Sequence, residues 1–208
     1  MVDLISQEYD IVARYQGGNN AGHTVIHGDK KLALHLMPSG VMYEGTSPVI
    51  GNGCIVDPEI LLSEIDMLAE QGISAERLKI SGNAHIVMPY HKDLDGAHEK
   101  KLGKNLIGTT KRGVGPCYMD KMNRTGLRIQ DMLDEKIFRE KLESALAYTN
   151  PILEKVYELP PTPSSRSARL PALRGAHPSL HRGEQPVPQR ADRGRPRERA
   201  PRAEPPVR

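Results

Sequence analysis

Hydrophobic and polar residues follow two different patterns along positions 1–158. Short apolar runs predict strands at 11–15, 25–26, 31–36, 78–80 and 85–88. Longer periodic stretches predict helices at 57–71, 90–101 and 134–148. Strands and helices that follow one another in this way predict an α/β fold, with a mainly parallel central sheet and flanking helices.

Turn and cap residues mark the boundaries of these elements. Asn52 and Gly53 are typical of a tight turn. Asp57, followed by Pro58, predicts a helix that begins with an aspartate N-cap, and Gly72 predicts its end. The apolar face of this helix comprises Leu61, Ile65 and Leu68. Pro151 predicts an interruption of the last helix.

The composition changes abruptly after Leu159. Residues 160–208 contain 11 arginines, no lysine and 11 of the 17 prolines, and they carry a formal charge of +7. The preceding residues carry −4, so the total of +3 conceals two opposite parts. A segment this polar and proline-rich buries too little apolar surface to offset its ordering entropy. We therefore predict a globular α/β domain over 1–158 and a disordered tail over 159–208.

Two explanations of the tail remain open. Its arginines would suit phosphate contacts with a nucleic acid, but it has no repeat and lacks the aromatic side chains that stack on bases. Arg, Pro, Ala, Ser and Gly without Lys or Ile are also what an out-of-frame reading of GC-rich coding sequence gives. We favour the second explanation, so no nucleic-acid partner is expected.

Membrane and secreted classes do not fit the composition. No apolar run approaches the ~20 residues of a transmembrane helix, and residues 1–10 lack the apolar segment of a signal peptide. Two cysteines, Cys54 and Cys117, cannot form a disulfide framework and suit a reducing cytoplasm. We assign both to packing, and we assign His85 and His91 to structure or surface rather than to a metal site.

Two glycine-rich loops carry the candidate chemistry. In Gly17–Thr24 the glycines allow a ligand to approach the backbone closely, Asn20 offers an amide, and His23 can donate a proton near neutral pH. In Gly108–Pro116 adjacent threonines, two cations and spaced glycines suit an anion. The alternative interpretations are a structural turn and a solvated basic loop. In the first loop, eight consecutive residues all suit close approach of a ligand, so we favour ligand binding over a structural turn there.

Together the two loops resemble adenylosuccinate synthetase, the GTP-dependent ligase of purine synthesis. Several long, unrelated strings agree with the family, in its order, over nearly all of residues 1–158. They are Tyr15–Thr24, Leu36–Gly40, Pro48–Gly53, Ala84–His91 and Gly108–Arg128. The tail lies outside the resemblance.

The resemblance implies a reaction and a set of residues. The family joins IMP and L-aspartate to give adenylosuccinate, with GTP as the energy source and Mg²⁺ as the cofactor, after the 6-oxygen of IMP is phosphorylated. It implies a sheet related to that of P-loop GTP-binding proteins. It also implies a homodimer in which Arg124 reaches the IMP of the partner subunit.

The resemblance also implies the site residues. The catalytic acid corresponds to His23, and the carbonyl that binds magnesium corresponds to Gly22. The GTP-binding residues implied are Gly22, His23 and Thr24. The IMP-binding residues implied are Asn20, Ala21, Gly22, His23, Thr110 and Arg124.

Departures from the family pattern bear on activity. The sequence does not contain the family's first strand and Gly-Asp-Glu-Gly-Lys-Gly-Lys phosphate loop, which carries the catalytic aspartate, or the long C-terminal half that recognises guanine and aspartate. We therefore expect that the 208-residue chain does not catalyse the ligation. The alternative function is that of an inactive fragment that retains part of the IMP and GTP sites and the dimer contacts. In addition, Lys111 stands where the family commonly has glycine.

Overall fold

The computed structural model describes residues 5–27, 30–105, 108–167 and 170. Its strands are β1 (Ile11–Arg14), β2 (His23–His27), β3 (Lys30–Leu34), β4 (Ser47–Ile50), β5 (Ile55–Val56), β6 (Lys79–Ile80) and β7 (His85–Ile86). A parallel sheet has the order β1-β4-β6, and β5 pairs in parallel with β7. β2 and β3 form an antiparallel hairpin. The predicted strands and their mainly parallel arrangement are confirmed, and the hairpin is the antiparallel addition.

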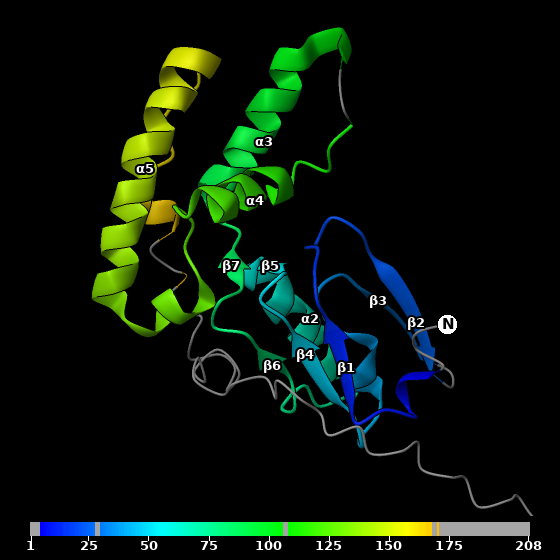
Figure 1. Ribbon diagram of the computed structural model, residues 1–208. Helices are drawn as coiled ribbons and strands as arrows, with labels where there is room; N and C mark the ends of the chain where they lie inside the picture. Colours follow the sequence, from blue (N-terminus) through cyan, green and yellow to red (C-terminus); the bar gives the residue numbers. More distant parts are fainter. Residues whose placement is uncertain (1–4, 28–29, 106–107, 168–169, 171–208) are drawn as a thin grey trace, which may run out of the picture.

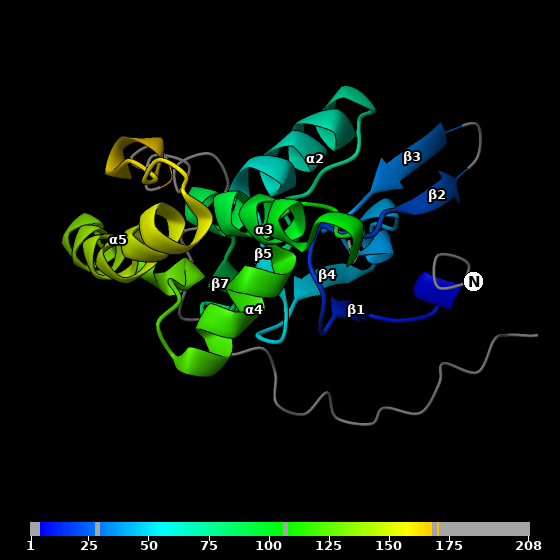
Figure 2. The ribbon, with the colours of Figure 1, turned by 90° about the horizontal axis from the view of Figure 1, so that it is seen from above.

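Helices flank these strands. They are α2 (Pro58–Glu70), α3 (Pro89–Leu102), α4 (Val114–Asn123) and α5 (Glu135–Tyr157). Short 3-10 turns lie at Ser39–Met42, Gly103–Asn105, Ile129–Leu133 and Ser164–Arg166. Figures 1 and 2 show α3 and α5 side by side, with the β2–β3 hairpin on the far side of the parallel strands.

One apolar cluster holds the helices to the strands. Ile50 of β4, Leu61 and Leu68 of α2, and Phe138 of α5 are all buried in it. Leu61 and Leu68 lie on the predicted apolar face of α2, with Ile65 partly covered beside them. Burying a side chain of this size is worth about 1.5–3 kcal/mol. The cluster therefore fixes the frame from which the two glycine-rich loops project.

Two helix predictions need correction. The α5 helix begins after Asp134, as predicted, but it continues through Pro151 to Tyr157. Beyond Pro151 the helix contacts α3, where Lys101 donates to the Val156 carbonyl at 2.8 Å, and such tertiary contacts override local helix propensity. The sequence pattern also misses α4, because Gly115 and Pro116 look like the end of a loop. Both residues lie in the first turn of the helix, where proline is tolerated.

Residues 160–167 and 170, which the structure describes, fall within the segment predicted as a disordered tail over 159–208. Thr162 is buried, and its backbone N–H and C=O are hydrogen-bonded to the side chain of Asn150 on α5. The Thr162 hydroxyl donates to Asp93 of α3 at 2.6 Å, and Arg166 contacts the same carboxylate at 2.6 Å. Polar contacts therefore dock this segment, which a count of apolar residues does not detect. Residues 168–169 and 171–208 lie outside the described residues.

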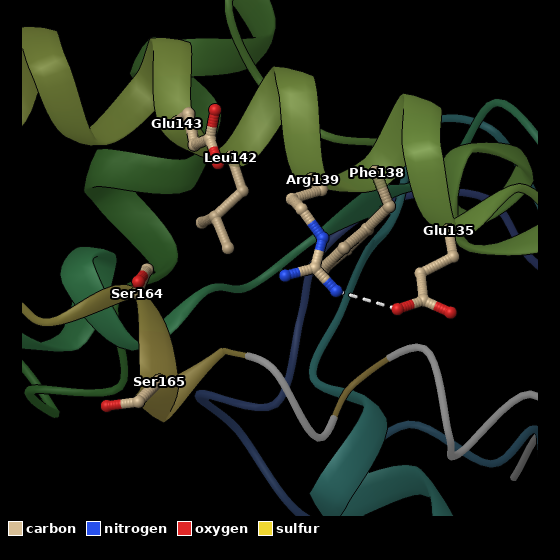
Figure 3. Close-up of a pocket in the computed structure, with 7 residues that line it drawn as sticks. All are labelled: Glu135, Phe138, Arg139, Leu142, Glu143, Ser164 and Ser165. Atoms are coloured by element: carbon tan, nitrogen blue, oxygen red, sulfur yellow. Dashed lines mark hydrogen bonds and ion pairs between the residues drawn. The ribbon is translucent and has the colours of Figure 1, made fainter.

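A hollow of about 290 Å³ lies where this segment meets α5 (Figure 3). Its lining residues are Glu135, Phe138, Arg139, Leu142, Glu143, Ser164 and Ser165. Arg139 and Glu135, one helical turn apart, form an exposed ion pair of 2.7 Å, a type of contact that contributes little stability. None of the lining residues belongs to the glycine-rich loops, so this hollow is not where the predicted chemistry lies.

We expect the fold to be sensitive to acid because of His85. Burial, together with the nearby charges of Lys121 and Arg128, lowers the pKa of His85 to about 4. As the pH falls from about 6.5 to about 4, the unfolded chain takes up a proton at this residue and the folded chain does not. The free energy of unfolding should therefore fall by about 3 kcal/mol over that interval. Urea unfolding as a function of pH measures it.

The matched variants are His85→Gln and His98→Gln. The first should reduce the acid-induced loss of stability, whereas the second removes an exposed histidine and should retain it. Equal pH slopes in the two variants would contradict the assignment to His85.

Candidate functional site

The first glycine-rich loop is held by groups from distant parts of the chain. The Gly17 N–H donates to the Tyr118 hydroxyl at 2.8 Å, and the Gly17 C=O accepts from the Ile55 amide at 3.0 Å. The Arg14 guanidinium donates to the Gly18 carbonyl at 2.7 Å. A Cβ on Gly18 would come within 2.8 Å of Ile55 Cγ1, so a side chain does not fit there. The backbone of this loop is therefore fixed up to residue 18.

Asn19 joins the same loop to α2 and α3. It is buried, and its side-chain amide donates to Asp57 at 3.3 Å. Lys92 of α3 forms a 2.7 Å ion pair with the same Asp57 oxygen. The predicted N-cap position of Asp57 is confirmed. Its side chain makes no capping bond, because its carboxylate binds Asn19 of the loop and Lys92 of α3 instead.

Two acidic residues of α3 hold the second glycine-rich loop. Glu99 Oε1 accepts the Gly108 N–H at 2.6 Å, and Asp95 Oδ2 accepts the Gly113 N–H at 2.9 Å. Both carboxylates are buried and lie four residues apart, on one face of the helix. Hydrogen bonds to an ionised acceptor are roughly twice as strong as neutral ones. The α3 helix therefore fixes both ends of the 108–113 loop.

At Gly113 this loop packs directly against the backbone of α3. The φ of Gly113 is +73°, and a Cβ here would lie 2.9 Å from the backbone carbon of His91 and the backbone nitrogen of Lys92. Lys111 also has a positive φ, of +54°. This conformation is one that glycine adopts without strain, which fits the glycine that the resembled family commonly has at this position.

The two loops meet at Asn19 and Arg112. The Arg112 guanidinium donates to the Asn19 carbonyl, a contact between residues 93 positions apart in the chain. Val114, at the end of the second loop, lies within 3.4 Å of the position that a Cβ on Gly18 would take. The fold thus brings the two segments singled out by sequence to one place.

Most of the predicted binding side chains are exposed at these loops. Asn20, Ala21 and Gly22 are exposed in the turn before β2, Thr24 is exposed on β2, and Thr110 is exposed in the second loop. Their neighbours Gly18, Asn19 and Gly113 are buried. Anchored residues therefore alternate with exposed ones, so that a ligand can reach polar groups on a fixed backbone.

His23 lies at the start of β2 and is half-buried. Burial lowers the pKa of its imidazole, and the charge of Arg14 lowers it further, against the opposing charge of Glu64. The imidazole is therefore neutral at pH 7, and a phosphate placed beside it would raise its pKa again. Glu64 is itself buried on α2, where its carboxylate accepts backbone N–H groups of residues 35–37 at 2.5–3.2 Å.

Arg124 is separated from the other predicted residues. It lies after the last turn of α4, whose ten residues span about 15 Å from the end of the second loop. There it lines a hollow of about 420 Å³ with Asp120, Arg128, Lys141 and Tyr148, among others. The structure does not bring Arg124 to Asn20, His23 or Thr110 within one chain. The predicted contact of Arg124 with the IMP of a partner subunit stays a prediction.

The predicted magnesium ligand, the carbonyl of Gly22, belongs to a residue that is exposed in the turn before β2. Within residues 5–27, 30–105, 108–167 and 170, no group of three or more His, Cys, Asp or Glu could hold a metal ion. Mg²⁺ commonly keeps several waters and binds substrate phosphates as well as one or two protein oxygens. A single protein ligand, the Gly22 carbonyl, together with substrate phosphates and waters would fit that coordination.

The cysteines assigned to packing and the histidines assigned to structure or surface are all found in the interior. Cys54 and Cys117 are free and completely buried, and His85 and His91 are buried as well. In the part of the chain that the structure describes, no helix has both the length and the apolar character needed to cross a membrane.

Comparison with known proteins identifies the family. The profile of the adenylosuccinate synthetase family matches residues 1–176. The chain belongs to this family. Adenylosuccinate synthetase of Heliobacterium modesticaldum is 52% identical over 157 residues, and that of Frankia alni is 57% identical over 155 residues. The alignments cover 76% and 74% of this chain but 37% and 36% of the relatives, so the chain spans a little over a third of their length.

The fold agrees with that of a solved adenylosuccinate synthetase. The chain is similar to the fully ligated enzyme from Plasmodium falciparum, with a TM-score of 0.73 and 34% sequence identity. The similarity covers 88% of this chain and 42% of that one. The arrangement of the strands, helices and loops described above is therefore an arrangement of the adenylosuccinate synthetase family.

The residues that hold the family's loops are not evident from this sequence. Asp95 and Glu99 belong to a stretch that looks like a solvated polar helix, and Glu64 lies in an ordinary amphipathic one. The one available signal is the spacing of Asp95 and Glu99, which places two acids on the same face as the apolar-facing His91. Without the fold, that spacing does not show which backbone N–H groups the acids meet.

We expect Gly113→Ala to destabilise the protein by about 2 kcal/mol or more. An alanine there would combine a positive φ with a clash against the backbone of α3. Gly115→Ala is the matched control, because a Cβ at Gly115 meets no atom within 4 Å. Its effect should stay within about 0.5 kcal/mol. Urea unfolding of the two variants measures the difference, and equal stabilities would show that the loop is not packed against α3 as described.

Proposed function

We propose that this chain provides the IMP-facing and GTP-facing loops of an adenylosuccinate synthetase. That enzyme joins IMP and L-aspartate in a GTP-dependent ligation of purine nucleotide synthesis. The observation that carries the proposal is the meeting of the two loops at Asn19 and Arg112. Buried groups fix the backbone of both loops, while their amide and hydroxyl side chains stay exposed.

The exposed groups suit a nucleoside monophosphate. The amide of Asn20 and the hydroxyl of Thr110 would donate hydrogen bonds to IMP, with Ala21, Gly22 and His23 bordering it. Neutral donors on a rigid backbone recognise phosphate oxygens without the desolvation cost of a buried charge. Arg124 would add the cation, from a second copy of the chain. Its place at the far end of the ten-residue helix α4 from the second loop fits a homodimer with shared sites.

His23 would act at the phosphoryl group that passes from GTP to the 6-oxygen of IMP. Transfer of a phosphoryl group depends mainly on positioning and on stabilising the charge of its oxygens. An imidazole that is neutral at pH 7 can donate a hydrogen bond to those oxygens and gain a proton as their charge grows. Gly22 and Thr24 would border GTP. Mg²⁺, when bound through the Gly22 carbonyl, would supply positive charge to the phosphates.

The proposal extends to fold ancestry and location. The parallel order β1-β4-β6 supports a relation to P-loop GTP-binding proteins. The GTP contacts of the family's phosphate loop are assigned to no residue here, because that string does not occur in the sequence. Two free, buried cysteines support a reducing compartment such as the cytoplasm.

Calorimetric titration of IMP into the full chain tests this assignment. We expect salt-sensitive binding that Thr110→Ala weakens by about fivefold or more, because a hydroxyl donor to a charged phosphate is lost. Ser63→Ala removes an exposed hydroxyl from α2 and should leave the affinity unchanged. A chain that is folded by circular dichroism and does not bind IMP would refute the proposal.

A further inference from the structure

Asp120, in the last turn of α4, is bound by two side chains from the start of α3. The Tyr90 hydroxyl donates to Asp120 Oδ2 at 2.9 Å, and His91 Nε2 lies 3.0 Å from the same oxygen. His91 Nδ1 accepts the Met88 N–H at 2.9 Å, so the proton of a neutral imidazole is on Nε2 and is donated to Asp120. Tyr90 and His91 are completely buried.

The charge states agree with this geometry. Burial lowers the pKa of His91, and burial followed by the charge of Asp120 raises the pKa of Tyr90. Burial alone would raise the pKa of Asp120, but the hydrogen bonds from His91 and Tyr90 hold it below its usual value. At neutral pH a carboxylate therefore accepts hydrogen bonds from two neutral, buried donors. Separating them would leave polar groups unsatisfied in the interior.

The backbone carbonyl of Asp120 closes the turn that follows α4. It accepts the N–H groups of Thr125 and Gly126 at 3.0 and 3.2 Å. Arg124, inside this turn, has a φ of +62°, a conformation that is unfavourable for arginine and that surrounding contacts have to impose. Gly126 packs against the ring of His85, where a Cβ would come within 2.7 Å. The turn is therefore fixed on both sides.

We propose that Asp120 is a positioning residue for Arg124. Its carboxylate ties the end of α4 to α3, and its carbonyl closes the turn from which the guanidinium extends. Together they set the direction of the Arg124 side chain toward an anion on a second copy of the chain. This inference rests on the proposed contact between Arg124 and IMP, and it identifies what holds that contact in place.

The other cations of the same hollow are already engaged. Arg128 donates to Asn83 Oδ1 at 3.1 Å, and Lys141 forms a 2.7 Å ion pair with Asp131. Arg124 is exposed, and its guanidinium has no partner among the residues that the structure describes. It is therefore the cation of this hollow that is available to a phosphate.

A double-mutant cycle on the full chain tests the proposal, with IMP affinity measured by calorimetry. Arg124→Ala and Asp120→Ala should each weaken IMP binding by about tenfold, and the double variant should be no weaker than either, because both changes remove the same contact. Asp120→Asn retains an oxygen acceptor for Tyr90 and His91, so it should recover most of the affinity. Asp66→Ala, which removes an exposed carboxylate of α2, is the control and should bind as the parent does.

Nuclear magnetic resonance supplies a signature that does not depend on IMP. The Nε2–H of His91 should be protected from solvent exchange in the parent chain and in Asp120→Asn, and should lose that protection in Asp120→Ala. If Asp120→Ala does not fold, Tyr90→Phe replaces it in the cycle. That variant removes one donor and keeps the ring, and it should weaken IMP binding by about threefold.

The outcomes separate this inference from the function on which it rests. Additive losses in the cycle, or a folded Asp120→Ala that binds IMP normally while Arg124→Ala does not, would overturn the positioning role and leave the proposed function standing. An unprotected Nε2–H of His91 in the parent chain would also overturn the positioning role and leave the proposed function standing. An Arg124→Ala variant that binds IMP normally would refute the contact between Arg124 and IMP, and the positioning role would fall with it.

Discussion

The candidate site depends on one constraint, which is the binding of the second glycine-rich loop by side chains of α3. Asp95 and Glu99 take the backbone N–H groups at the two ends of that loop. The same helix reaches the first loop through Lys92 and Asp57, and it reaches the turn of Arg124 through His91 and Asp120. One helix therefore orients all three segments that the family relationship connects with nucleotides.

Three buried acidic residues of the domain bind backbone N–H groups, which suits loops that receive an anionic ligand. Asp95, Glu99 and Glu64 are buried carboxylates, a costly arrangement unless each finds donors. Glu64 accepts backbone N–H groups of residues 35–37, and Asp95 and Glu99 each accept one backbone N–H of the second loop. These negatively charged carboxylates therefore lie on the inner side of the loops and hold the loop backbone in place. The exposed side chains of Asn20 and Thr110 are neutral donors that phosphate oxygens can approach without repulsion, and the exposed Lys111 beside them is a cation.

Sequence reasoning succeeds here where structure is local and fails where it is tertiary. Five of the seven described strands follow from short apolar runs, which do not depend on distant residues, whereas β4 and β5 are not predicted. The contact of Asn20–Thr24 with a ligand stays a prediction from the glycine-rich string. The continuation of α5 past Pro151 and the docking of Thr162 depend on contacts with α3, which no local pattern contains. The same holds for Asp57, whose cap position is predictable although its partners are not. The separation of Arg124 from the loops follows from the undetected α4.

The central claim is that two loops far apart in sequence form one binding site for IMP. Titration of the ¹⁵N-labelled chain with IMP, followed by backbone amide resonances, tests it most directly. The account predicts that the amides of Gly17–Thr24 and of Gly108–Gly115 shift together and fit a single dissociation constant, while those of the exposed end of α2 do not move. Shifts confined to one loop, or two loops that titrate with different dissociation constants, would contradict it.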